Sequence, residues 1–310
     1  MILVARMRKK EIEQRLGEIV RGRIAADEPI ASHTTLGVGG PADWMVSPRS
    51  VEELRGVLRL LAENEVPRLV LGGGSDIVVR DGGFRGVCIA LARNLSGATI
   101  AGDRTIEAMA GETLASLLRL SREASLSGLE FTVTIPGTVG GGVVMNVGAF
   151  GSSFADLLEA ITVIDGTGHE RTIERGTIRA AYRRIDLPEG AVVVRARFRL
   201  EPEARDRIEE AVDRNREHRL RTQPLGEASA GCIFKNPSPA EPAGRLIDQA
   251  GLKGLRFGGA SVSALHANYI VNDGTATARD VLALIEEVRR RVRETHGVVL
   301  EPEVRIVGDE

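Results

Sequence analysis

This chain of 310 residues has few of the residues that build disulfide frameworks, metal sites and membrane spans. Its two cysteines, Cys88 and Cys232, are too few for a disulfide framework and too far apart for a CxxC metal motif, which favours a reducing compartment. The five histidines have no metal-ligand spacing, so no metal is expected. No run approaches about 20 uninterrupted apolar residues, so no membrane span is expected either.

The sequence also lacks a targeting signal and a strong net charge. The start, MILVARMRKK, places a short apolar run before basic residues, the reverse of a secretory signal, so a cytoplasmic protein is expected. The net charge of −2 argues against a nucleic-acid or acidic-membrane partner. Lysine is rare among the 41 basic residues, which makes Lys235 notable; the lysines are Lys9, Lys10, Lys235 and Lys253.

Glycine, by contrast, is abundant, with 36 residues, and the excess is clustered. The clusters are LGGGSD at 71–76 and TIPGTVGGG at 134–142. Without a Cβ, consecutive glycines can take positive φ and turn several backbone N–H groups toward one anion. A single glycine run is as often a flexible loop, but two such runs together predict a binding site for a long anionic cofactor.

The neighbouring residues exclude two common phosphate loops. Neither segment has the Lys-Ser/Thr pair of a Walker loop, and neither reads as a glycine turn that opens a helix, with an acid about 20 residues further on. After 71–76 comes the β-branched run Ile77-Val78-Val79, followed by a turn at 80–83. The first loop is therefore predicted to join strand to strand.

Periodicity and capping signals predict an α+β chain. Ser50 and Glu53 form a capping box before an amphipathic helix, and Gly251 and Gly297 are predicted to end helices. Further helices are expected at 112–124, 204–221, within AGRLIDQAG and at 278–296, and strands are expected at 68–71, 86–91, across 160–200 and at 304–308.

Seven motifs, in order from about residue 30 to residue 308, resemble the UDP-N-acetylenolpyruvoylglucosamine reductase (MurB) family. The resemblance is specific because seven separate motifs coincide in order and at compatible spacing. The motifs are TTLGVGGPAD, LGGGSDIVV, IPGTVGGGVVMNVGAFG, the pair Tyr182-Arg183, QPLGEASAGCIFKNP, HANYIVNDG and LEPEVRIVG.

The resemblance implies an FAD-binding fold of the vanillyl-alcohol-oxidase (PCMH) type, in which two α+β subdomains bind FAD and a C-terminal α+β domain caps the substrate. The corresponding segments are 20–95 for FAD-binding subdomain 1, 96–200 for FAD-binding subdomain 2 and 204–310 for the C-terminal substrate-binding domain. The short connection from Tyr182 to the strand at 191–200 is similar to the family's compact type.

The resemblance also implies a reaction. NADPH reduces non-covalently bound FAD, and the flavin then reduces the enolpyruvyl double bond of UDP-N-acetylglucosamine enolpyruvate, giving UDP-N-acetylmuramate for peptidoglycan synthesis. Hydride addition leaves negative charge on the substrate as an enolate, which needs a cation or hydrogen-bond donor and a proton source. The implied partner is a nucleotide-sugar substrate, and no obligate protein partner is inferred.

Three residues match the family's catalytic positions. Arg183 and Glu303 match its enolate-stabilising residues, and Cys232 matches its proton donor, which is usually serine. A thiol, with a pKa near ~8.5, is a stronger acid than an alcohol and can still donate a proton. Outside their motifs, Cys232 would be interpreted as a small buried apolar residue, Arg183 as a surface charge and Glu303 as a strand-edge carboxylate.

The FAD pyrophosphate is expected to bind the backbone amides of 72–76 and 137–142. The family usually has asparagine where Asp76 stands, and a carboxylate beside a pyrophosphate costs energy unless it points away or accepts backbone N–H bonds. The expected cofactor-binding residues are Gly72, Gly73, Gly74, Ser75, Asp76, Gly137, Thr138, Gly140, Gly141 and Asn146.

The substrate is expected to bind residues of three motifs. The ammonium of Lys235 suits a diphosphate as a compact point charge. Ile185 stands where the family commonly has serine, and His266 is expected to be structural. The expected substrate-binding residues are Tyr182, Gln223, Lys235 and Asn236.

Two alternatives stay open on the sequence alone. One is a related flavin oxidase with another substrate. The other is a flavin-binding protein without catalysis, motivated by the departures from the family pattern at Asp76, Ile185 and Cys232. In that second case flavin would be bound, but the family's substrate would not reoxidise it.

Overall fold

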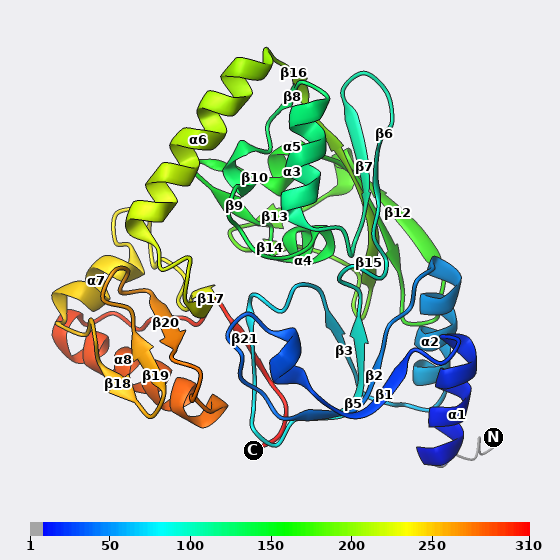
Figure 1. Cartoon of the computed structure of the whole chain (residues 1–310), viewed down its shortest axis with the longest axis horizontal. Helices are drawn as coiled ribbons and strands as arrows, with labels where there is room; N and C mark the ends of the chain where they lie inside the picture. Colours follow the sequence, from blue (N-terminus) through cyan, green and yellow to red (C-terminus); the bar gives the residue numbers. More distant parts are fainter. Residues whose placement is uncertain (1–8) are drawn as a thin grey trace. The chain divides into compact units, whose positions relative to one another are not determined.

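The computed structural model describes residues 9–310 (Figure 1). The first eight residues of the start MILVARMRKK, whose order of apolar and basic residues was interpreted above, lie outside the described residues. By its internal contacts the chain divides into two compact units. The first unit takes in the chain up to Glu28, Asp43–Gly73 and Gly86–Asn215, and the second takes in Pro29–Ala42, Gly74–Arg85 and Arg216–Glu310.

A five-stranded antiparallel sheet runs through the first unit in the order β12-β11-β15-β7-β6. The predicted period-two alternation appears in β15, where Val194, Ala196 and Phe198 are buried and the residues between them are more exposed. The strands are β6 (Ala98–Ile100), β7 (Thr105–Met109), β11 (Leu158–Ile164), β12 (Glu170–Glu174) and β15 (Val192–Arg199).

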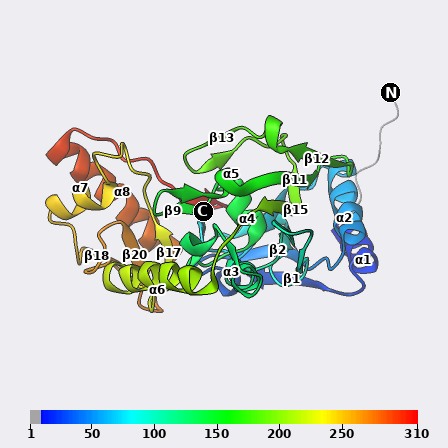
Figure 2. The ribbon, with the colours of Figure 1, turned by 90° about the horizontal axis from the view of Figure 1, so that it is seen from above.

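A second sheet has the order β1-β2-β5-β3, with β3 and β5 parallel. Ser50 caps helix α2, as predicted, because its Oγ accepts the Glu53 N–H, and the Glu53 carboxylate accepts the N–H of Arg49. Helix α2 lies beside α1 (Figure 2). These elements are α1 (Lys9–Ile19), α2 (Val51–Glu63), β1 (Ile24–Pro29), β2 (Pro41–Val46), β3 (Arg68–Leu71) and β5 (Phe84–Ala90).

The second glycine segment forms a helix, α4 (Val139–Val144), where a loop was predicted. A Cβ on Gly140 would lie 2.8 Å from the Cβ of Ala110, and a Cβ on Gly142 would lie 2.7 Å from Cε2 of Phe154. Close packing therefore outweighs the low helix propensity of glycine. The description of this whole segment as a loop was therefore wrong.

The remaining elements of the first unit are short, apart from α3 and α6. Helix α6 (Arg205–Thr222) continues from this unit into the second one. The others are α3 (Leu114–Glu123), α5 (Phe154–Leu157), β8 (Leu126–Ser127), β9 (Gly148–Ala149), β10 (Ser152–Ser153), β13 (Ala180–Ala181), β14 (Arg184–Ile185), β16 (Glu201–Pro202) and the 3-10 turns Glu130–Thr132 and Arg175–Thr177.

The second unit contains a four-stranded antiparallel sheet, β17-β20-β19-β18, and a parallel pair, β4 with β21. Helix α8 packs against β18, β19 and α7. The elements are β4 (Ile77–Val79), β17 (Ala228–Cys232), α7 (Ala243–Gln249), β18 (Arg256–Phe257), β19 (Ala260–Val262), β20 (Tyr269–Asn272), α8 (Ala278–His296), β21 (Arg305–Val307) and a 3-10 turn at Ile30–His33.

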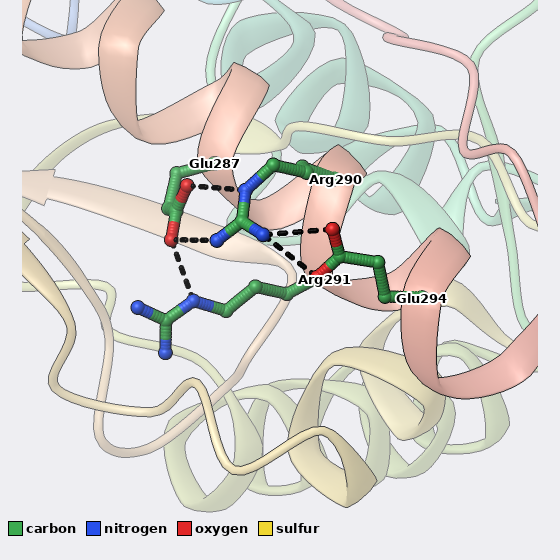
Figure 3. A network of polar contacts seen from close by, with 4 residues as sticks. All are labelled: Glu287, Arg290, Arg291 and Glu294. Atoms are coloured by element: carbon green, nitrogen blue, oxygen red, sulfur yellow. Dashed lines mark hydrogen bonds and ion pairs between the residues drawn. The ribbon is translucent and has the colours of Figure 1, made fainter.

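Helix α8 has the limits predicted from the sequence, beginning after Thr277 and ending before Gly297, whose φ of 71° is left-handed. Its exposed face carries a network in which Arg290 bonds both Glu287 and Glu294 (Figure 3). The bonds from Arg290 and from Arg291 lower the pKa of Glu287 to about 2. This network lies on a solvated helix surface, where such pairs add little stability.

The compact units follow a different division from the three predicted parts. One hydrophobic core joins residues across most of the range 12–212, and a second core joins Leu36, Val38 and Val78 to the C-terminal region. The roles assigned to 20–95, 96–200 and 204–310 therefore remain predictions. Within residues 9–310, no helix is long and apolar enough to cross a membrane, and no cluster of His, Cys, Asp or Glu could hold a metal ion.

Candidate functional site

The two predicted glycine segments touch each other in the first unit. A Cβ built on Gly72 would lie 2.4 Å from Oγ1 of Thr138, and a Cβ built on Gly73 would lie 2.6 Å from the Cα of Gly137. Only glycine allows the two backbones to approach this closely. The contact brings two glycine-rich segments side by side, and glycine-rich backbone can turn N–H groups toward a pyrophosphate.

Helix α4 uses some of the amides that were assigned to the pyrophosphate. The Gly140 N–H donates to the carbonyl oxygen of Ala110 at 2.8 Å, and the N–H groups of Val139 and Gly142 also donate within the first unit. These three amides of the range 137–142 are therefore committed, and Gly140 has a packing role. The Gly141 N–H also donates, to Oγ1 of Thr138 at 3.5 Å, so the backbone amides that remain as candidates in this segment are those of Gly137 and Thr138.

The end of the first glycine loop belongs to the second unit. Gly74 has a φ of 62°, and a Cβ there would lie 2.0 Å from the carbonyl oxygen of His33. The Asp76 carbonyl accepts the N–H of Arg305 at 3.0 Å, where the parallel pair of β4 and β21 begins. The backbone of Asp76 is thus part of a strand pair, and roles for Ser75 and Asp76 toward a phosphate stay predictions.

Tyr182 and Arg183 form the two-residue loop of the hairpin β13–β14 in the first unit. Arg183 has a φ of 59°, in the left-handed region that few non-glycine residues adopt. Its Nη1 donates to the carbonyl oxygen of Gly148 at 3.1 Å, and its guanidinium carbon lies 5.4 Å from the centroid of the Tyr182 ring. A cation is therefore held at the tip of a tight turn, beside the ring of Tyr182, a residue that is 55% exposed.

Two buried residues hold this hairpin in place: Ile185, in β14 itself, and Asn146. Ile185, which stands where the family commonly has serine, is buried in the core of the first unit. Asn146 is 8% exposed, and its side chain spans two backbone groups. Its Nδ2 donates to the carbonyl oxygen of Ala181 at 3.1 Å, and its Oδ1 accepts the N–H of Ala155 at 3.0 Å. The Asn146 amide, predicted to bind the cofactor, is thus engaged within the protein.

Cys232 lies directly after a bulge in the second unit. Ser229 pairs with Val271 and Cys232 pairs with Tyr269, so β17 has one more residue than β20 between these two pairs. Gly231, within the extra stretch, has a φ of 72°. Bulges redirect side chains and are common beside active sites.

The two cysteines lie in different surroundings. Cys88 is fully buried in β5, and burial raises the pKa of its thiol to about 12. Cys232 is only partly buried. The description of a small buried apolar residue therefore fits Cys88 and does not fit Cys232.

The predicted residues Cys232 and Glu303 lie on neighbouring extended segments. The Glu303 N–H donates to the carbonyl oxygen of Ile233 at 2.7 Å, and the Lys235 N–H donates to the carbonyl oxygen of Glu301 at 2.9 Å. These two bonds fix the register of the segment after β17 against the segment before β21.

The side chains of Lys235 and Glu301 also pair, with 2.5 Å between Nζ and Oε1. Glu301 was missed in the sequence, although it lies two residues before Glu303 in the same motif. The lysine side chain is 31% exposed and the glutamate 70%, so the pair is open to solvent. A diphosphate that bound Lys235 would compete with this carboxylate.

The other two predicted substrate-binding residues also bond within the second unit. Oδ1 of Asn236 accepts the N–H of Ala243, at the start of α7, at 3.0 Å. Oε1 of Gln223 accepts a hydrogen bond from Nη1 of the buried Arg219 at 3.0 Å. In both residues these bonds use the amide oxygen, whereas the amide NH₂ group is a hydrogen-bond donor. A role in substrate binding stays a prediction for both.

Asn268 is a structural residue that the sequence reasoning missed. It is 3% exposed, its Nδ2 donates to the carbonyl oxygen of Phe234 at 2.8 Å, and its Oδ1 accepts the N–H of Phe234 at 3.0 Å. The side chain thus bonds the segment after Cys232 as a neighbouring strand would. The signal in the sequence is an asparagine within the apolar run HANYIV.

His266 lies in the same motif and packs against its neighbours. Its Nδ1 accepts the N–H of Asn268 at 3.2 Å, and its ring meets the ring of Tyr269 edge-on at 4.9 Å between centroids. Burial, assisted by the charge of Lys253, lowers the pKa of His266. This environment agrees with the structural role expected for it.

Two protein-family models match the chain. A model of the FAD binding domain matches residues 42–174, and one of the C-terminal domain of UDP-N-acetylenolpyruvoylglucosamine reductase matches residues 223–307. The chain is 45% identical to the UDP-N-acetylenolpyruvoylglucosamine reductase of Geobacter metallireducens, over 97% of this chain and 99% of the relative. It is 46% identical to that of Rubrobacter xylanophilus, over 91% and 95%.

Solved structures agree with this. The MurB enzyme of Thermus caldophilus aligns with a TM-score of 0.79 at 38% identity, covering 91% of this chain and 97% of that one. p-Cresol methylhydroxylase aligns with a TM-score of 0.60 at 11% identity, covering 96% and 89%, which shows a shared fold alone.

The fold and the FAD binding domain define a flavin-dependent oxidoreductase of the vanillyl-alcohol-oxidase (PCMH) type with a C-terminal α+β domain. Within that class, the chain belongs to the UDP-N-acetylenolpyruvoylglucosamine reductase family, because two relatives of that name are each 45% identical to it over 96% or more of its length.

Proposed function

We propose that this protein reduces UDP-N-acetylglucosamine enolpyruvate to UDP-N-acetylmuramate with electrons from NADPH, as a cytoplasmic enzyme of peptidoglycan precursor synthesis. One observation carries the proposal. The bond from the Glu303 N–H to Ile233 aligns the segments that bear Glu303 and Cys232, in a chain whose relatives are named for this activity.

The FAD pyrophosphate is assigned to the backbone amides of Gly137 and Thr138, which lie against Gly72 and Gly73 of the first glycine segment. Bound FAD supplies the hydride chemistry. The protein's own residues hold the nucleotide sugar and control the charge and the proton at the reacting carbons. Arginine guanidinium is a permanent cation, so Arg183 is suited to stabilise negative charge that develops on the substrate carboxylate.

The reduction adds a hydride to the terminal carbon of the enolpyruvyl group, and the electron pair of the double bond moves to the α-carbon and carboxylate. Arg183 stabilises this enolate by its positive charge, and Glu303 does so by donating a hydrogen bond from its protonated carboxyl group. The Sγ–H of Cys232 gives its proton to the α-carbon, which completes the lactyl ether and leaves a thiolate that solvent reprotonates. Lys235 and Asn236 bind the diphosphate, with Tyr182 and Gln223 as further substrate contacts.

The test is identification of the product. Purified protein with its flavin is incubated with NADPH and UDP-N-acetylglucosamine enolpyruvate, and the nucleotide sugar is analysed by mass spectrometry. The proposal expects a product heavier by two hydrogen atoms, formed in proportion to NADPH consumed. If NADPH is consumed at the same rate with and without this substrate, and the nucleotide sugar is unchanged, a flavin oxidase with another substrate is favoured. Bound flavin with no turnover would favour a protein without catalysis.

A further inference from the structure

We propose that Asn146 is a positioning residue for Arg183: its side-chain amide holds the β13–β14 hairpin so that the guanidinium is presented to the substrate. This inference rests on the proposed function of Arg183. It gives Asn146 a different role from the cofactor contact that its motif predicts.

The first support is the engagement of the Asn146 amide. Nδ2 donates to the carbonyl oxygen of Ala181, the residue before the loop pair Tyr182-Arg183, and Oδ1 accepts the N–H of Ala155. The residue is 8% exposed. Buried amides of this kind are costly to leave unpaired, so the two bonds fix the side chain. It therefore links two backbone segments and has little surface to offer a ligand.

The second support is that one short stretch holds the hairpin at two points. Asn146 bonds the backbone just before Tyr182, and the carbonyl oxygen of Gly148, two residues after Asn146, accepts from Nη1 of Arg183 at 3.1 Å. One bond sets the backbone of the loop and the other sets the direction of the guanidinium. Both depend on the same turn between α4 and β9.

The third support is the backbone conformation. Arg183 has a φ of 59° and Asn146 a φ of 43°, both left-handed. Residues other than glycine persist in this region only where the surrounding structure determines them, and such residues gather at functional sites. Asparagine tolerates the region better than most residues, whereas arginine has no such tendency. The conformation of Arg183 therefore needs an external constraint, and the bond from Asn146 to Ala181 supplies one.

The fourth support is the rigidity of the anchor. Ala155 follows Phe154, which is fully buried and meets Phe198 edge-on at 4.7 Å and Phe131 edge-on at 6.3 Å between ring centroids. The Ala155 N–H thus comes from a helix fixed in the core. Asn146 connects this core position to the turn that carries Arg183, through hydrogen bonds alone.

Two substitutions test the side-chain hydrogen bonds of Asn146 separately from its left-handed backbone conformation. Asn146→Asp keeps the acceptor for Ala155 but replaces the donor to Ala181 by a carboxylate oxygen, and it tolerates positive φ. Asn146→Gly keeps the backbone conformation and removes both bonds. The matched control is Asn94→Asp, in the same unit, whose Nδ2 donates to the carbonyl oxygens of Ala90 and Ala92 at 3.1 and 3.2 Å.

The experiment measures three quantities for each variant: the FAD dissociation constant by reconstitution of the flavin-free protein, the rate of flavin reduction by NADPH, and the rate of flavin reoxidation by substrate. We expect both Asn146 variants to slow reoxidation roughly 10- to 100-fold, the usual cost of a misplaced catalytic group, with the other two quantities within about threefold. Weakened FAD binding with a normal rate of reoxidation would overturn the inference and would indicate that Asn146 binds the cofactor.

Two further readouts distinguish positioning from general damage. Hydrogen exchange of the peptide that covers residues 180–185 should quicken in Asn146→Asp and stay unchanged in Asn94→Asp. In an Arg183→Gln background, Asn146→Asp should slow reoxidation by no more than about twofold further, since coupled residues are not additive. Multiplied effects would overturn the inference. Normal reoxidation in Arg183→Gln alone would instead refute the proposed function of Arg183 itself, and the inference with it.

Discussion

The backbone N–H of Glu303 donates to the carbonyl oxygen of Ile233 at 2.7 Å, which ties the C-terminal segment to the residue directly after Cys232. The two predicted catalytic residues of the second unit are thus held by one strand register. A change in that register would displace Glu303 relative to Cys232, because a slip of one residue turns the side chains of a strand to its opposite face. The placement of the proposed proton donor and of one proposed enolate-stabilising residue therefore depends on backbone bonds as well as on their own side chains.

The identity of the residue at 232 should affect only one half of the reaction. Cys232→Ala is expected to slow flavin reoxidation by substrate ~10² to 10⁴-fold, since it removes the proton donor, and to leave flavin reduction by NADPH intact. Cys232→Ser should retain measurable turnover. Cys88→Ala is the control, because Cys88 is fully buried and should change stability without changing either half-reaction. Equal losses in both halves for Cys232→Ala would exclude the donor role.

The contact between the glycine segments predicts that Gly73 is required for flavin binding. In Gly73→Ala the new Cβ would meet the Cα of Gly137 at 2.6 Å, so the segments must separate. Overpacking of this kind costs about 1–3 kcal/mol, and it should appear as a lower flavin content and a weaker FAD affinity. Gly176→Ala, with nothing within 4 Å of the added Cβ, is the control. Full flavin content in Gly73→Ala would mean that this contact is not part of the cofactor site.

The pairing of Lys235 with Glu301 predicts that removing the charge of Glu301 strengthens binding of the nucleotide sugar. Glu301→Gln should lower the KM for the nucleotide sugar about two- to fivefold, because an exposed ion pair of this kind is weak and its removal frees the ammonium. Lys235→Ala should raise the same KM. Asp248→Asn, which breaks the similar pair with Lys253 at 2.9 Å, should leave the KM unchanged. A higher KM in Glu301→Gln would show that this carboxylate supports substrate binding.

His266 predicts a pH dependence of stability. Burial lowers its pKa in the folded protein, so the unfolded chain binds the proton more readily. The neutral ring thus contributes stability above the unfolded pKa, and that contribution is lost as the pH falls. The stability difference between the protein and His266→Asn, measured by urea unfolding, should therefore shrink between about pH 7.5 and 5.5. A constant difference across this range would contradict the assignment.

Elements governed by local signals could be predicted from the sequence. Helix α8 has its limits at Thr277 and Gly297 because a capping side chain and a left-handed glycine act within one turn. The first glycine loop joins β3 to β4, as its β-branched neighbours indicate. The motif that brings Glu303 close to Cys232 was available only through the family resemblance, because nothing local relates two residues so far apart.

Elements governed by packing could not be predicted. Six residues rich in glycine form α4 because Ala110 and Phe154, both distant in sequence, leave no room for larger residues. For the same reason the roles of Asn146 and Asn268 were missed, since their backbone partners lie 35 and 34 residues away. A single sequence shows that an asparagine is present, but only the fold shows which carbonyl it bonds.

The most direct test of the account is anaerobic stopped-flow absorbance of the purified protein with its bound flavin. The flavin is first reduced with NADPH and then mixed with UDP-N-acetylglucosamine enolpyruvate, while the visible band of the oxidised flavin is followed. The account predicts a rapid return of this band that depends on substrate concentration. A flavin that stays reduced after mixing would contradict it.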